Sequence, residues 1–98
     1  MNTKKVKDQS LGGALREFIH ANKLQPGIDR INARDAWKKH MGNGVNSYTT
    51  AVDLRKDTLY VSLSSSVLRE ELSLGKTKII ALLNEELGRE LIKKLVLR

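Results

Sequence analysis

Residues 48–63 have the sequence YTTAVDLRKDTLYVSL, in which two stretches of alternating side chains flank a short polar segment. In residues 48–55 the even-numbered residues lie on one side of the expected strand: Tyr48, Thr50, Val52 and Leu54. In residues 58–63 the odd-numbered residues are apolar. Alternation with a period of two is typical of strands with one buried face. The pattern therefore predicts an antiparallel hairpin that turns at Lys56-Asp57 and carries Tyr60 on its outer face.

The segment after this hairpin predicts the longest helix of the chain. Residues 64–66 are serines that offer N-caps, and Gly88 stands where a C-terminal glycine belongs. Between them, apolar or small residues recur every three or four positions: Leu68, Leu72, Gly75, Ile79, Leu82, Leu83 and Leu87. We expect one continuous helix in which Gly75 allows a close approach of another backbone, with a break at Gly75 as the alternative. Residues 91–98 then form a last short strand, with Leu95 and Leu97 pointing inward.

Two helices are expected before the hairpin. Ser10 is an N-cap for the first, whose apolar face consists of Leu11, Leu15, Phe18 and Ile19. Gln25-Pro26-Gly27 should end it in a loop, because the residue before proline avoids helical angles. The second helix runs to Met41, before Gly42-Asn43-Gly44, with a kink near Asn32 where the apolar side changes.

The resulting order is helix, helix, strand, strand, helix, strand, without βαβ alternation. It predicts an α+β fold in which helices cover one face of a small three-stranded sheet. The chain has 98 residues and no cysteine, which fits one domain in a reducing cytoplasm. We expect a flexible basic arm at residues 1–9 and the domain at residues 10–98. No apolar run reaches the length of a membrane span, and the polar N-terminus is no secretory signal.

Motifs for catalysis are incomplete. Gly75-Lys76-Thr77 resembles the end of a phosphate-binding loop, but the glycine required five positions earlier is replaced by Glu70. His20 and His40 have no second metal ligand at a useful spacing, and His40 is either a surface histidine or a weak phosphate contact. We therefore expect neither an enzyme nor a cofactor, a metal or a small-molecule substrate.

The net charge of +7 favours a polyanionic partner. Trp37 is expected in the core, and Tyr60 either stacks on a base or is an ordinary strand aromatic. Few exposed aromatics favour binding through the nucleic-acid backbone with weak sequence specificity. The candidate binding residues fall into clusters along the chain: Lys4, Lys5, Lys7, Lys38, Lys39, Arg55, Lys56, Lys76, Lys78, Lys93, Lys94 and Arg98.

Short motifs in one order resemble the DciA-like family. They are Ala36-Trp37 followed by Gly42, Tyr48-Thr49, Leu59-Tyr60-Val61, Ser64-Ser65-Ser66, Glu71-Leu72-Ser73 and Leu83-Asn84. The resemblance covers about Leu11 to Arg98 and implies a bacterial K-homology-like domain without the usual Gly-x-x-Gly loop. It further implies binding to DNA and to the replicative helicase, promoting helicase loading or operation, in the cytoplasm at the nucleoid. It brings no catalytic residues.

Two other functions fit the same charge and element order. One is an RNA- or ribosome-associated K-homology-like module, and the other is a pure protein-interaction domain whose charge only maintains solubility. Both remain alternatives at the level of sequence.

Overall fold

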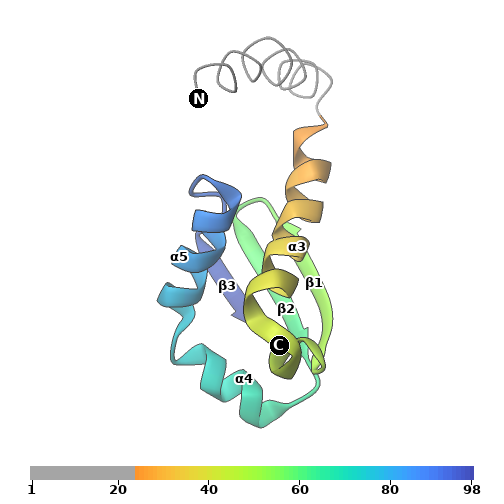
Figure 1. The fold of residues 1–98 in the computed structure, drawn as a ribbon, viewed down its shortest axis with the longest axis vertical. Coiled ribbons are helices and arrows are strands. Elements are labelled where there is room, and N and C mark those ends of the chain that lie inside the picture. Colours follow the sequence, from red (N-terminus) through yellow and green to blue (C-terminus); the bar gives the residue numbers. More distant parts are fainter. Residues whose placement is uncertain (1–23) are drawn as a thin grey trace, which may run out of the picture.

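The predicted hairpin forms two strands of a three-stranded sheet. In the computed structural model, which describes residues 24–98, β1 (Thr49–Arg55) pairs antiparallel with β2 (Thr58–Leu63). The connection is the expected turn, in which Lys56 adopts a left-handed backbone with φ 56°. β3 (Lys94–Leu97) pairs parallel with β2, so the sheet order is β1-β2-β3 (Figure 1). A parallel neighbour requires a crossover connection, and the chain between β2 and β3 supplies it as two helices.

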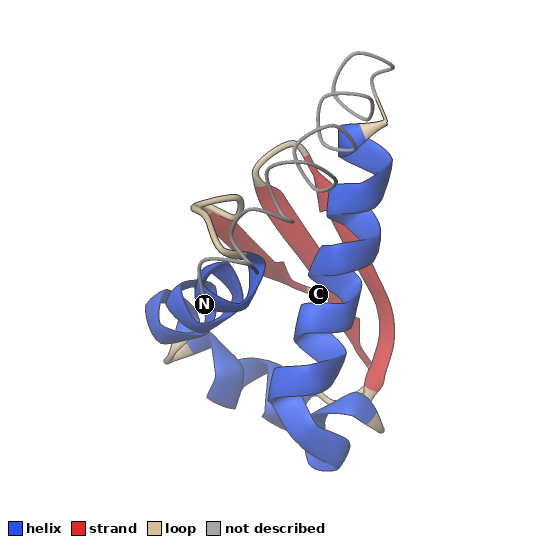
Figure 2. Cartoon of the chain, turned by 45° about the horizontal axis from the view of Figure 1, so that its top comes forward, coloured by secondary structure: helices blue, strands red, loops and turns tan. Residues whose placement is uncertain are grey.

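The helices α3 (Gln25–Asn46) and α5 (Lys76–Leu87) lie on one face of the sheet, and the shorter α4 (Ser66–Ser73) connects β2 to α5 (Figure 2). Within residues 24–98, no helix covers the opposite face. The predicted fold class is confirmed from Gln25 onward. The predicted basic arm and the helix expected after Ser10 lie outside the described residues.

The core lies between the two helices and the sheet. Trp37 from α3, Leu59 and Val61 from β2, Leu83 from α5 and Ile92 are its largest fully buried side chains. The Trp37 indole donates a hydrogen bond from Nε1 to Oγ1 of Thr49 over 3.2 Å. The predicted core position of Trp37 is therefore confirmed, and the inward face of the hairpin follows the predicted alternation from Val52 onward. Before Val52 the prediction is wrong, because the register shifts between Thr49 and Ala51, so that Thr49 contacts Trp37 while Thr50 is exposed.

The beginning and path of α3 differ from the sequence prediction. Gln25-Pro26-Gly27 forms its first turn rather than a loop, because a proline in the first turn of a helix sacrifices only an N–H that has no intrahelical partner. The helix does not kink near Asn32. As a consequence Ile31 does not turn inward and is 57% exposed. The backbone departs from helical geometry at Gly42, with φ 76°, at the predicted glycine segment.

The predicted continuous helix after β2 is wrong, and the alternative of a break at Gly75 is correct. α4 ends at Ser73, Leu74 is 82% exposed, and α5 begins after Gly75 with a change of direction (Figure 1). Glycine weakens a helix because it loses the most backbone entropy on ordering. A Cβ added at Gly75 would meet no atom within 4 Å, so the expected close approach of another backbone is absent there.

Two side-chain contacts position the segment that leads into β3. Gly88 ends α5 in the left-handed conformation, as predicted, with φ 79°. Asn84 then bonds the backbone of Ile92 twice, accepting from its N–H and donating to its carbonyl oxygen, both over 2.8 Å. Arg89 donates to the buried carboxylate of Asp29 on α3 over 2.7 Å. These contacts hold β3 in register, with Leu95 buried and Leu97 packed against the core, as predicted.

The serine cluster caps α4, because the Oγ of Ser65 accepts a hydrogen bond from the Leu68 N–H over 3.1 Å. Ser65→Ala should lower the free energy of unfolding by about 1 kcal/mol, since that N–H loses its partner. Urea denaturation measures the change. Ser66→Ala, one residue later in the first turn, should have less effect, and equal losses in the two variants would contradict the assigned cap.

Candidate nucleic-acid interface

The face of the sheet opposite the helices carries a central tyrosine surrounded by charged side chains. Tyr60 on β2 lies between Asp53 on β1 and Val96 on β3 in the strand register. The next outward row places Thr58 between Arg55 and Lys94. Since side chains alternate along a strand and the intervening leucines are buried, these side chains point to the uncovered face. We call this surface the open sheet face, and it also includes Arg98 directly after β3.

Two guanidinium groups lie against the ring of Tyr60. The Cζ atom of Arg98 lies 4.8 Å from the ring centroid, and that of Arg55 lies 5.6 Å from it. Both distances are within the range in which a cation is attracted by the ring quadrupole. The predicted outward position of Tyr60 is confirmed. Its ring contacts one arginine from each edge of the sheet, Arg55 on β1 and Arg98 directly after β3.

The two arginines differ in how they are held. Arg55 donates from Nε to Oδ2 of Asp53 over 2.8 Å. This hydrogen bond, together with the attraction between the two charges, raises the pKa of Arg55 above its ordinary value. Arg98 is exposed and is absent from the ion pairs found within residues 24–98.

The hairpin turn adds further positive charge at one end of this face. The backbone N–H groups of Lys93 and Lys94 donate to the carbonyl oxygen of Asp57 over 2.8 and 3.2 Å. The start of β3 therefore lies directly beside the turn that carries Lys56. Four of the twelve sequence-predicted binding residues are brought together on or beside the open sheet face: Arg55, Lys56, Lys94 and Arg98. Lys93 instead lines a pocket beside α5, on the helical side of the sheet.

The remaining predicted residues do not join this group. Lys38 and Lys39 lie on α3, and Lys76 and Lys78 lie at the start of α5, all in the helical layer. The lysines predicted at positions 4, 5 and 7 lie outside the described residues.

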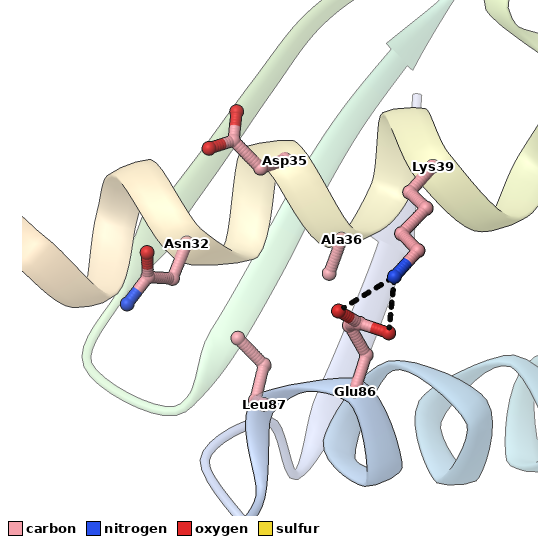
Figure 3. A pocket seen from close by; sticks show the side chains of 6 residues that line it. All are labelled: Asn32, Asp35, Ala36, Lys39, Glu86 and Leu87. Carbon is pink, nitrogen blue, oxygen red and sulfur yellow. Dashed lines mark hydrogen bonds and ion pairs between the residues drawn. The ribbon is translucent and has the colours of Figure 1, made fainter.

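Lys39 and His40 are both engaged by one carboxylate of α5. The Nζ atom of Lys39 donates to both carboxylate oxygens of Glu86 over 3.2 Å, and Nε2 of His40 lies 2.8 Å from Oε1. Figure 3 shows the ion pair of Lys39 with Glu86 at the edge of a pocket between α3 and α5. Because these charges already satisfy one another, the pocket is a helix-to-helix contact, and we assign it no ligand.

A family model described as "Dna[CI] antecedent, DciA" matches residues 10–97. The chain belongs to the DciA family. Membership implies a role in helicase loading for DNA replication, and hence an interaction with the replicative helicase. A search of curated proteins gave no match. Among the helices of residues 24–98, none is both long and apolar enough to cross a membrane.

The contact of α3 with α5 makes the stability of this DciA-family domain depend on pH. Hydrogen bonds from His40 and then Lys39 lower the pKa of Glu86. A lowered carboxyl pKa contributes stability above the unfolded value of about 4.3, and this contribution is lost as the pH falls through the folded value. Glu86→Gln should therefore lower the melting temperature at pH 7, and the difference from the unsubstituted protein should vanish at acidic pH, below the folded pKa of Glu86.

The exposed neighbour Glu85 provides the control for that substitution. Glu85→Gln should change the melting temperature little at either pH, because the hydrogen bonds from α3 go to Glu86. A Glu86→Gln effect that is the same at both pH values would contradict the assigned ion pair.

Sequence reasoning missed the Tyr60 cluster of this DciA-family domain, although part of its signal was present. The alternation already placed Asp53, Arg55 and Tyr60 on one side of the hairpin. The contribution of Arg98 depends on the parallel pairing of β3 with β2, which is set by the crossover through α4 and α5. No local pattern encodes that register.

Proposed function

We propose that this chain assists DNA replication without catalysis of its own, by binding DNA through the open sheet face and by contacting the replicative helicase. The helicase part extends the role that family membership implies. The DNA part is supported above all by one observation, the gathering of four cations on or beside a sheet face that no helix of residues 24–98 covers. Such a chain would act in the cytoplasm, at the nucleoid.

The chemistry of the face favours contacts with phosphates. Arginine and lysine side chains neutralise phosphates by releasing condensed counterions, which supplies affinity without sequence information. Within residues 24–98, the open sheet face presents no helix that could enter the major groove and read base edges. Binding on this face is therefore charge-driven and weakly dependent on sequence.

We also propose that residues 1–9 add phosphate contacts through Lys4, Lys5 and Lys7, beside a domain of residues 10–98. Lys38, Lys76 and Lys78 would be secondary contacts on the helical layer. Lys39 would contribute less than the others, because Glu86 already neutralises it.

The salt dependence of binding tests the DNA part. Fluorescence anisotropy with a labelled single strand and a labelled duplex should show log K falling with log salt by roughly 0.7 to 0.9 for each phosphate neutralised. Binding that is absent or independent of salt would overturn this part. Competition between the labelled DNA and structured RNA of equal length tests the alternative of an RNA-associated module, which predicts tighter binding to RNA than to DNA.

Recovery of the helicase tests the second part. The full chain should retain purified replicative helicase on an affinity resin both before and after nuclease treatment. Retention lost with nuclease would mean that nucleic acid alone bridges the two proteins, and it would contradict a direct contact.

A further inference from the structure

Tyr60 occupies the centre of the open sheet face, where its ring is the one aromatic group among the outward side chains of the three strands. The ring is half-buried beneath two guanidinium groups rather than packed in the core. It therefore contributes little to the apolar interior, and its π surface is available to any planar or cationic group that replaces an arginine.

The two guanidinium groups are unequal in this respect. Arg55 is tied to Asp53 on its own strand by a 2.8 Å ion pair, which keeps it beside the ring. Arg98 is exposed and lies closer to the ring, at 4.8 Å. A cation–π contact at an exposed site is a weak interaction. Arg98 can therefore leave the ring at small cost, whereas Arg55 remains.

We propose that Tyr60 is a base-stacking site for single-stranded DNA, in which an unpaired base displaces Arg98 from the ring and Arg98 then binds the adjoining phosphate. This inference rests on the proposed function and adds the strand type and the residue that selects it. Stacking of a base on an aromatic side chain is stronger than the exposed cation–π contact that it replaces.

The position of the ring on the central strand of the sheet selects single strands. Bases in a duplex are stacked on one another and present only their edges in the grooves, so their flat surfaces cannot reach a ring at the centre of a sheet. An unpaired base can lie flat on Tyr60, while Arg98, Lys94 and Arg55 surround it with positive charge. A duplex would contact the same cations through its phosphates alone.

Substitution of Tyr60 tests the stacking site with three probes of equal length: oligodeoxythymidylate, an abasic phosphodeoxyribose strand and a duplex. Tyr60→Leu should weaken binding of oligodeoxythymidylate roughly tenfold and leave the other two probes unchanged. Tyr60→Phe keeps the ring and should restore the affinity. The near-ultraviolet circular dichroism of Trp37, the single tryptophan of the chain, verifies that each variant is folded.

The outcomes separate this inference from the proposed function. Unchanged binding of oligodeoxythymidylate by Tyr60→Leu, or an equal loss for the abasic strand, would overturn the stacking site while DNA binding itself stands. Failure of the unsubstituted protein to bind any of the three probes would instead overturn the proposed function.

Discussion

Trp37→Ala should lower the free energy of unfolding by about 3–5 kcal/mol, which is a large share of the roughly 5–15 kcal/mol that stabilises a domain of this size. The side chain is 1% exposed at the contact of α3 with the sheet, so its removal leaves a cavity that rigid neighbours cannot fill. It also removes the donor that bonds Oγ1 of Thr49. Urea denaturation followed by circular dichroism measures the change.

Two companion variants make this result interpretable. Trp37→Phe keeps an aromatic ring in the core and should cost less than Trp37→Ala, since it removes the hydrogen bond and only part of the volume. Leu74→Ala should change stability by less than about 0.5 kcal/mol, because Leu74 is 82% exposed. A mild effect of Trp37→Ala, similar to that of Leu74→Ala, would contradict the described core.

Reversing two charges on the open sheet face should produce the largest loss of DNA affinity. The double variant Lys94→Glu with Arg98→Glu removes two phosphate contacts, and at about 0.1 M salt this should weaken binding at least roughly 30-fold. The slope of log K against log salt should fall by about 1.4 to 1.8. Fluorescence anisotropy with a labelled single strand measures both quantities.

A control with the same change of net charge lies on the helical layer. Lys38→Glu with Lys78→Glu alters two exposed lysines of α3 and α5, on the side of the sheet away from the open face. We expect a clearly smaller loss of affinity from this pair. Equal losses would mean that binding follows the net charge of the domain rather than the open sheet face.

The parts of the fold encoded in short stretches were predictable. The alternation in residues 48–63 predicted the hairpin and, from Val52 onward, its inner face, and Gly88 marked the end of α5. The register shift between Thr49 and Ala51 has no such local signal. The break between α4 and α5 was harder to predict, because the apolar stripe continues through Gly75 with helical spacing. Gly75 makes a break less costly, and the packing of α5 against α3 and β3 favours the broken helix over the continuous one.

The candidate site shows the same division between local and distant information. Charge clusters in the sequence included Arg55, Lys94 and Arg98, but their meeting around Tyr60 depends on pairing between strands far apart in the chain. Lys39 looked equivalent to the other lysines, yet Glu86, 47 residues later, neutralises it. Sequence therefore supplied the inventory of charges, and tertiary structure determines which of them act together.

Mapping the surface that DNA touches tests the central claim most directly. Backbone amide chemical shifts of the isotopically labelled full chain are recorded during titration with oligodeoxythymidylate. The largest changes should follow β2 and β3 at Tyr60, Val96 and Arg98, with smaller changes at the hairpin turn. Changes confined to the turn between α4 and α5, at Leu74 to Lys78, would contradict the open sheet face as the DNA-binding surface.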